Sequence, residues 1–221
     1  MPGKIAFVSD IHLSFKTKEK DEVFKKFLEK EGNRFSKIYI LGDLFNFGFL
    51  FQKGIHPYYR EWIEFLSKKK NIVFLPGNHD FWIFPYLKHF GIEVIKNPSK
   101  VKIDKKRFLL AHGRVERNPR LSVSMLLLSF PIFVFLYSLL PPKIGTHIAE
   151  KIMNFKKSKK KIKKKMKVLI PKGVEFIITG HNHIGFIKKI DDLSIANPGS
   201  FRDSKNFLIY EKGILYFRRL E

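Results

Sequence analysis

The sequence feature that most constrains the fold is an apolar run, residues 37–41, that is followed at once by Gly42 and Asp43. A run of β-branched, aromatic and aliphatic residues without polar alternation predicts a strand buried on both faces. Open α/β sheets bind their ligands at the carboxyl ends of such strands. A single Gly-Asp pair after a strand is more typical of a plain turn, so its meaning depends on the rest of the chain.

Four other apolar runs are also followed by loops that carry Asp, Asn or His. These loops are Asp10-Ile11-His12, Gly77-Asn78-His79-Asp80, His112-Gly113 and Gly180-His181-Asn182-His183. Carboxylate, amide and imidazole groups are the ligands that a pair of divalent metal ions needs. Asp43 lies midway in this series, so we interpret its carboxylate as the bridge between two ions.

Two of these loops carry side chains spaced one residue apart. In extended backbone such residues point the same way, which predicts that Asp10 and His12 form a chelating pair. A turn aspartate with an exposed histidine is the alternative. By the same geometry, His181 and His183 are expected to bind one metal each.

The loop after the third apolar run holds two candidate catalytic residues. Asn78 is expected to be a neutral oxygen ligand, although an asparagine on a tight glycine turn is usually structural. His79 is adjacent in sequence and does not easily reach the same metal. We therefore assign it to the substrate phosphate or the leaving group.

The segments between the motifs predict an α/β fold. Helices are expected at residues 18–30 and 61–68, because their apolar residues recur at helical spacing. Strands are expected at 4–9, 71–75, 93–95, 100–103, 107–111, 175–179, 186–190, 206–210 and 213–217, with a turn at 197–200. At 221 residues, the chain is predicted to be one domain, 1–221, with an insertion at 116–170.

Composition limits the class of partner. The net charge of +23 favours nucleic acid, anionic lipid or a phosphorylated substrate. The absence of cysteine excludes disulfides and thiolate metal sites. A strand pattern begins directly after the first residues, so no cleavable signal peptide is expected and the cytoplasm is the predicted compartment.

The motifs, in this order, resemble those of the calcineurin-like metallophosphoesterase superfamily. The resemblance covers nearly the whole chain outside residues 116–171, and it implies a four-layer α/β/β/α sandwich with two metals at one sheet edge. One metal would be held by Asp10, His12, Asp43 and His183, and the other by Asp43, Asn78, His112 and His181. His79 matches the family histidine that stabilises the transferring phosphate or protonates the leaving oxygen. Manganese is the expected metal, with iron and zinc as alternatives.

The insertion is apolar in its first half and basic in its second half. Residues 121–142 carry no charge and are long enough for a transmembrane helix. Ligands lie on both sides of this segment, so a single span would separate His181 and His183 from Asp10. We therefore expect a helical cap that enters the membrane interface or covers a lipid, with an ordinary buried helix pair as the alternative. The lysine-rich residues 151–167 are typical of an anchor on anionic lipid.

Such an insertion is similar to that of one branch of the superfamily, the UDP-2,3-diacylglucosamine pyrophosphatases of lipid A synthesis. This resemblance implies a lipid-linked nucleotide substrate and a peripheral place on the inner membrane. Arg114, Arg117 and Arg120 are expected to reach a substrate phosphate. Neither nucleic acid nor an obligate protein partner is expected.

The chain departs from that branch at three positions. His79 stands where an arginine is usual, and Arg114 and Asn46 stand where acids are common. A soluble phosphodiesterase acting on nucleotides or nucleic acid therefore remains the alternative function.

Overall fold

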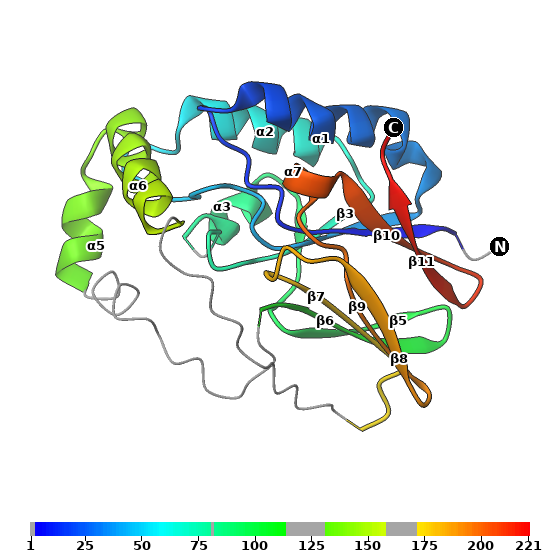
Figure 1. Cartoon of the computed structure of the whole chain (residues 1–221). Coiled ribbons are helices and arrows are strands. Elements are labelled where there is room, and N and C mark those ends of the chain that lie inside the picture. Colours follow the sequence, from blue (N-terminus) through cyan, green and yellow to red (C-terminus); the bar gives the residue numbers. More distant parts are fainter. Residues whose placement is uncertain (1–2, 81, 114–130, 158–171) are drawn as a thin grey trace.

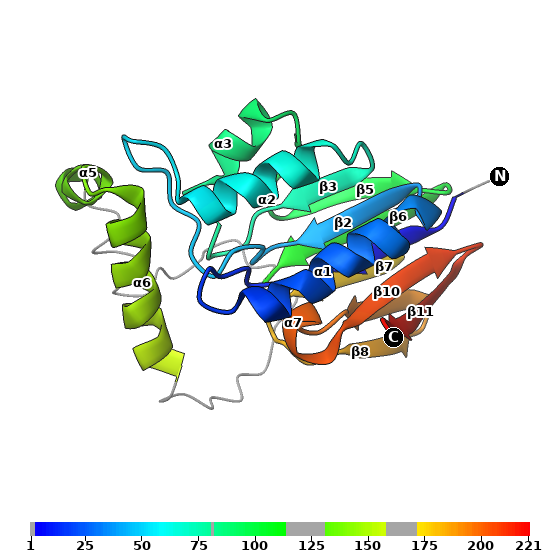
Figure 2. The same ribbon diagram turned by 90° about the horizontal axis from the view of Figure 1, so that it is seen from above.

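The computed structural model of the chain describes residues 3–80, 82–113, 131–157 and 172–221. Two β-sheets pack face to face, and helices lie on the outer side of one of them (Figures 1 and 2). The α/β class with two packed sheets is therefore confirmed.

The first sheet combines parallel strands in its centre with an antiparallel hairpin at one edge. Its strand order is β11 (Ile214–Arg219), β10 (Asn206–Glu211), β1 (Ile5–Val8), β2 (Lys37–Leu41), β3 (Ile72–Leu75) and β4 (Glu93–Val94). Strands β1 to β4 are parallel, whereas β10 pairs antiparallel with β1 and β11. The carboxyl ends of β1, β2 and β3 therefore lie at one edge.

The second sheet also combines parallel strands in its centre with antiparallel strands at its edges. Its order is β5 (Ser99–Ile103), β6 (Lys106–His112), β7 (Phe176–Gly180), β9 (Leu193–Asn197) and β8 (Phe186–Ile190). Strands β6, β7 and β9 are parallel, and β5 and β8 are antiparallel strands at the edges. His112 at the end of β6 is in register with Gly180 at the end of β7.

Burial on both faces explains the unbroken apolar runs. In β2, Ile38 and Ile40 pack into the core beneath the helices, whereas Tyr39 and Leu41 pack into the core between the sheets. Phe7 of β1 stacks on Phe108 of the opposite sheet, with ring centroids 6.0 Å apart. These aromatic contacts hold the two sheets, and hence their carboxyl ends, together.

Helices α1 (Lys18–Lys30) and α2 (Pro57–Ser67) lie on the outer face of the first sheet (Figure 2). The predicted apolar face of α1 is confirmed, because Phe24, Phe27 and Leu28 are buried. The predicted helix at 61–68 begins four residues earlier, where Pro57 occupies the first turn. Two short helices, α3 (Phe84–His89) and α7 (Phe201–Ser204), and a 3₁₀ turn at Gly32–Arg34 were not predicted from the sequence.

Two helices of the predicted insertion are described, α5 (Pro131–Ser138) and α6 (Pro142–Lys157), and both stand at the end of the sandwich (Figure 1). Tyr137 and Ala149 pack against Phe47, Phe49 and Phe51 of the loop that follows β2. No described helix has the length and apolar character needed to cross a bilayer. Arg114, Arg117, Arg120 and most of the lysine run lie outside the described residues, so the boundaries 116–170 stay a prediction.

Helix α1 carries a buried carboxylate on its inner face. Asp21 is 1% exposed and accepts hydrogen bonds from the backbone N of Ser14 and from the Tyr58 hydroxyl, both at 2.7 Å. Arg202 Nη1 lies 3.3 Å from its other oxygen. Burial raises the pKa of Asp21 to about 6 despite these donors, with a further contribution from the nearby Glu150.

We expect Asp21 to make folding stability depend on pH. Because its pKa is higher in the folded state than in the unfolded chain, the folded state binds the proton more tightly. The free energy of unfolding should therefore fall by about 3 kcal/mol as pH rises from about 4 to about 6. Chemical denaturation of Asp21→Asn across this range should show a flatter profile than the wild type, whereas the exposed neighbour variant Glu22→Gln should not. Parallel profiles for Asp21→Asn and the wild type would contradict this assignment.

Candidate metal centre

The polar loops predicted from the sequence converge at one edge of the two sheets. Asp10 and His12 follow β1, Asp43 follows β2, and His79 follows β3. From the second sheet come His112, the last residue of β6, and His181 and His183, which follow β7. Three groups of these side chains have ligand atoms within 4.8 Å of one another: Asp10, His12 and His183; His12, Asp43 and His79; and Asp43, His112 and His181.

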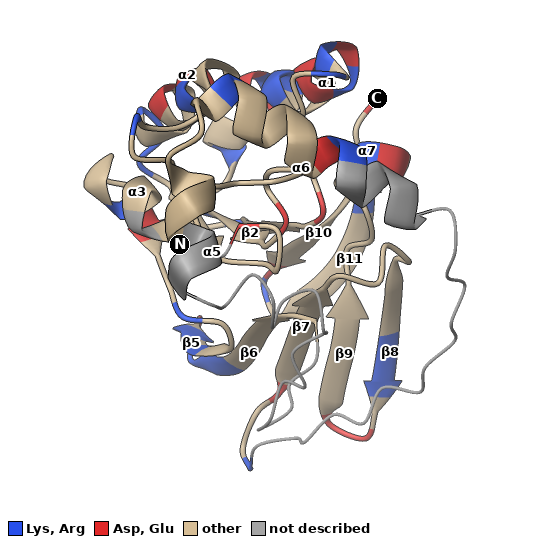
Figure 3. Cartoon of the chain, turned by 90° about the vertical axis from the view of Figure 1, so that its left-hand side faces the viewer, with Lys and Arg blue, Asp and Glu red and all other residues tan. Residues whose placement is uncertain are grey.

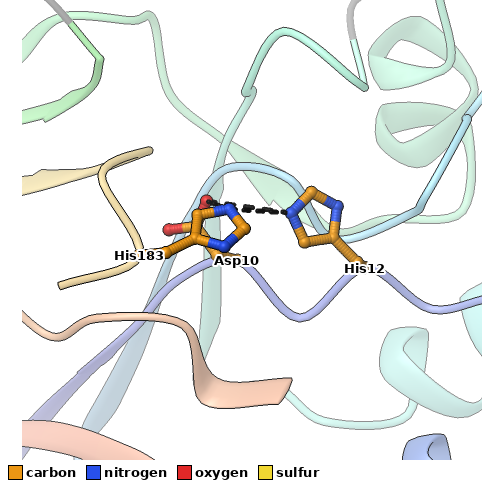
Figure 4. A group of neighbouring side chains, drawn as sticks. All are labelled: Asp10, His12 and His183. Carbon is orange, nitrogen blue, oxygen red and sulfur yellow. Dashed lines mark hydrogen bonds and ion pairs between the residues drawn. The ribbon is translucent and has the colours of Figure 1, made fainter. Parts of the chain in front are cut away.

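The first group joins the two sheets. His183 Nε2 lies 3.3 Å from Asp10 Oδ1 and 3.3 Å from His12 Nε2. Figure 4 shows His12 and His183 with ring nitrogens directed at the carboxylate of Asp10. Two imidazoles and one carboxylate facing a common point are a ligand set suited to a divalent cation.

The carboxylate of Asp43 belongs to the other two groups. Its Oδ2 lies 3.2 Å from His112 Nε2 and 3.8 Å from both His12 Nε2 and His79 Nε2. Its Oδ1 accepts a hydrogen bond from the backbone N of His79 at 3.0 Å, which leaves Oδ2 directed at the imidazoles. Burial raises the pKa of Asp43, but the surrounding imidazoles lower it by more, so the carboxylate is ionised.

Asp80 holds the loops after β2 and β3 together. This side chain is fully buried and accepts hydrogen bonds from the backbone N of Leu44, Phe45 and Gly77, at 3.0–3.2 Å. Gly77 must be glycine, because a Cβ there would lie 2.3 Å from Asp43 Oδ1. The glycine and the aspartate of this motif therefore position Asp43.

His112 is oriented as metal-binding histidines commonly are. Its Nδ1 lies 2.7 Å from the carbonyl oxygen of Leu41 and donates to it, so Nε2 points at Asp43. Burial lowers the pKa of His112, but the hydrogen bond and charge of Asp43 outweigh it and raise the pKa to about 9. The carboxylate of Asp43 thus stabilises a positive charge on this ring, and it would stabilise a bound cation at the same place.

Asn97, which was not predicted from the sequence as part of the site, fixes the backbone around His112. Its Oδ1 accepts from the backbone N of His112 at 3.0 Å, and its Nδ2 donates to the carbonyl oxygens of Pro76 and His112. It thereby links the end of β6 to the turn before Asn78. Asn78 itself is exposed, and its role as a ligand stays a prediction.

The prediction of extended backbone at the paired ligands is wrong. Asp10 and His12 have φ of 55° and 50°, and His181 and His183 have φ of 79° and 56°. Asp43 also has a positive φ of 52°. These values lie in the left-handed region, which costs a non-glycine residue on the order of 1–2 kcal/mol. The side chains converge because the backbone of these loops turns at residues with left-handed φ values, not because the backbone is extended.

Helix α7 contributes two residues for which the sequence analysis made no prediction. Arg202 Nη1 donates to the carbonyl oxygen of His12 and Nη2 donates to Thr17 Oγ1, and these contacts brace the curled loop. Asp203 Oδ2 lies 3.8 Å from His183 Nδ1. The spacing of Ser200 and Asp203 is typical of the first turn of a helix, so the sequence did indicate α7. In the structure, Ser200 Oγ accepts a hydrogen bond from the backbone N of Asp203.

His79 occupies a distinct position in the cluster. Its Nδ1 lies 2.6 Å from the carbonyl oxygen of Asn46, so Nδ1 carries a proton and Nε2 faces the other imidazoles and Asp43. The ring centroids of His79 and His12 are 4.9 Å apart. In this orientation, Nε2 of His79 can contact a bound phosphate or a metal ion.

Comparison with known proteins gives a family and a fold. A family model described as calcineurin-like phosphoesterase matches residues 3–185. Among solved structures, a novel archaeal phosphodiesterase superposes with a TM-score of 0.52 at 17% identity, covering 98% of this chain and 99% of that chain. This second likeness concerns the fold alone.

Curated relatives named UDP-2,3-diacylglucosamine hydrolase are also similar to this chain. The protein from Hamiltonella defensa is 28% identical over 202 residues, which cover 84% of this chain and 79% of the relative. The protein from Coxiella burnetii is 33% identical over 111 residues, which cover 48% of this chain and 45% of the relative. The match with this second relative thus spans less than half of its length.

We expect Asp43→Asn to lower the occupancy of both metals, because Asp43 Oδ2 is the oxygen shared by the imidazoles of two groups. His79→Ala should keep both, since it leaves the other groups intact. Metal analysis after loading with Mn²⁺ and gel filtration checks both statements. Two ions per chain in Asp43→Asn would contradict the bridging role, and loss of an ion from His79→Ala would make His79 a ligand.

Proposed function

The chain belongs to the calcineurin-like phosphoesterase family, and from this premise we propose that it hydrolyses a phosphate ester or pyrophosphate bond in a lipid-linked nucleotide. The proposed substrate is UDP-2,3-diacylglucosamine, cleaved to UMP and 2,3-diacylglucosamine 1-phosphate. The relatives named UDP-2,3-diacylglucosamine hydrolase support this choice. The alternative is a phosphodiesterase acting on nucleotides.

The observation that carries the proposal is the cluster around Asp43, in which ligand groups from both sheets share side chains. One metal would be held by Asp10, His12, Asp43 and His183, and the other by Asp43, Asn78, His112 and His181. Two divalent ions bound there would activate a water and neutralise charge on the phosphoryl group. Manganese is our first choice, with iron and zinc also compatible with oxygen and imidazole ligands.

His79 is the proposed general acid. Its Nδ1 is held by the carbonyl oxygen of Asn46, so its Nε2 is the nitrogen that faces the reacting phosphate. As the oxygen of a water bonds to phosphorus, the proton that this water loses would pass to solvent. As the bond to the leaving group breaks, a proton on His79 Nε2 would pass to the leaving oxygen. Arg114, Arg117 and Arg120, which lie outside the described residues, are proposed to contact a second phosphate of the substrate.

The insertion is proposed to bind the lipid and the surface of an anionic membrane. Phe135, Leu136, Leu139, Ile144 and Ile148 of the α5–α6 region are 41–56% exposed. Figure 3 shows little charge on the described part of α5 and α6 that faces the viewer. The lysine run begins near the end of α6 and continues into residues 158–167, outside the described part. Apolar side chains next to clustered lysines suit a peripheral protein on the inner face of the membrane.

The function is tested by turnover of the purified chain with Mn²⁺. We expect UDP-2,3-diacylglucosamine to give UMP and the sugar phosphate, identified by mass spectrometry. His79→Ala should slow this reaction roughly 10²–10⁴-fold, the scale of a general acid, whereas His89→Ala, an exposed histidine on α3, should not. Hydrolysis of bis(p-nitrophenyl) phosphate and nucleotides without hydrolysis of the lipid substrate would favour the alternative function.

The membrane surface is tested separately, with vesicles that contain phosphatidylglycerol. Phe135→Ser combined with Leu136→Ser should weaken co-sedimentation about tenfold or more, since two exposed apolar side chains lose their burial in the interface. Ile190→Ser with Ile214→Ser is the matched control, because these residues are also exposed but lie on β8 and β11. Equal losses in both double variants, or no loss in the first, would refute a membrane contact through α5 and α6.

A further inference from the structure

Helix α6 carries a buried carboxylate that the proposed chemistry does not use. Glu150 is 0% exposed. Its Oε1 accepts hydrogen bonds from Ser14 Oγ at 2.9 Å and from the Tyr59 hydroxyl at 2.8 Å. Lys16 Nζ lies 3.8 Å from Oε2.

A carboxylate is a costly residue at such a position. Burying it costs several kcal/mol unless donors and charges compensate, and an apolar residue of similar volume avoids that cost. Hydrogen bonds are directional, whereas apolar contacts are not. The contacts of Glu150 therefore define a position for α6 that apolar packing alone leaves less defined.

One donor, Ser14, belongs to the loop that carries His12, and the other, Tyr59 of α2, packs against the loop that carries Asp43. Ser14 lies two residues after His12, and its backbone N is held by Asp21. The ring of Tyr59 lies 4.9 Å from that of Phe45, which is two residues after Asp43. Glu150 thus contacts the first loop directly and the second loop through one ring.

Other contacts of α6 are apolar, involve backbone or join two rings, as in His147 and Phe15, whose ring centroids lie 6.2 Å apart. Gly145 lies so close to Phe51 that a Cβ would be 2.2 Å from its ring. The Tyr137 hydroxyl donates to the carbonyl oxygen of Gly145 at 2.6 Å, which joins α5 to α6. The contact with Phe51 reaches the loop after β2 at a point beyond Asp43, but it is apolar. Glu150 accepts the hydrogen bond that joins α6 to the side chain of Ser14, two residues after His12.

We infer that Glu150 is a positioning residue that sets helix α6 in register with the loops carrying His12 and Asp43. A substrate bound by the insertion then presents its phosphate at the metal centre. This inference rests on the proposed function, because it concerns a substrate that touches both the insertion and the metals. A small phosphodiester that touches only the metals does not need this register.

The test compares two substrates in matched variants. Glu150→Leu keeps the volume and removes the acceptor, Glu150→Gln keeps Oε1 as an acceptor, and Glu61→Leu is the same change at an exposed site of α2. We expect Glu150→Leu to lower kcat/KM for UDP-2,3-diacylglucosamine by roughly 10–100-fold, the scale of a 1 Å misplacement. Its turnover of bis(p-nitrophenyl) phosphate should stay within about 3-fold of the wild type, and Glu150→Gln should recover most of the loss with the lipid substrate.

A second measurement does not depend on the substrate. Amide hydrogen exchange over residues 143–151 should accelerate about tenfold or more in Glu150→Leu and not in Glu61→Leu, because the helix loses its polar contact. Should Glu150→Leu fail to fold, Tyr59→Phe removes one donor and should shift both readouts in the same direction by a smaller amount.

The outcomes separate this inference from the proposed function. A parallel loss of both activities would overturn the inference, because Glu150 would then support the catalytic core itself. The inference would also be overturned if Glu150→Leu changed neither the turnover of the lipid substrate nor the amide hydrogen exchange of residues 143–151. A wild-type chain that hydrolyses only the small diester refutes the proposed substrate, and the exchange experiment then decides whether Glu150 positions α6.

Discussion

The rest of the structure depends on two carboxylates, Asp10 and Asp43, that are buried at 0% and 2% exposure where two sheets meet. Among the described residues, both carboxylates form ion pairs with imidazoles, and these are contributed by both sheets. Buried negative charges close together destabilise a fold unless positive charge compensates them. Protonated imidazole does this for Asp43, as the raised pKa of His112 indicates, and divalent cations would do it more completely. The same buried carboxylates therefore affect both the packing of the two sheets and the binding of a cation between them.

Left-handed backbone brings these side chains together and has to be stabilised by the surroundings. Asp10, His12, Asp43, His181 and His183 all have positive φ. Hydrogen bonds from neighbouring side chains hold these loops: Asp80 binds the loop after β2, and Asn197 Nδ2 donates to the carbonyl oxygen of Gly180. Strain of this kind persists only where many contacts determine the conformation. The conformation of these loops is therefore determined by contacts within the protein.

Part of this structure follows from the sequence, and the remainder depends on tertiary contacts. Residues 37–41 predict a strand buried on both faces because no polar alternation interrupts them, and β2 confirms it. The converging histidines could be predicted because strand ends of parallel sheets share an edge. Their backbone could not, since curled loops are imposed by partners such as Arg202, which is distant in the sequence. The burial of Glu150 could not be predicted either, because a glutamate on a helix is usually exposed. Its burial depends on the donors Ser14 and Tyr59, which are distant in the sequence.

Helices α5 and α6 are attached to the sandwich away from the candidate metal ligands. The candidate ligands among the described residues all lie on the strand ends of the sandwich, so the insertion contributes none of them within the described part. It joins the core through an apolar cluster around Phe49 and through the buried contact of Glu150. If α5 and α6 bind the lipid as proposed, changes in their exposed face would alter which lipid is bound without disturbing the loops that carry the candidate ligands. Glu150 is the residue that connects the two parts, because its carboxylate lies on α6 and accepts a hydrogen bond from Ser14 in the loop that carries His12.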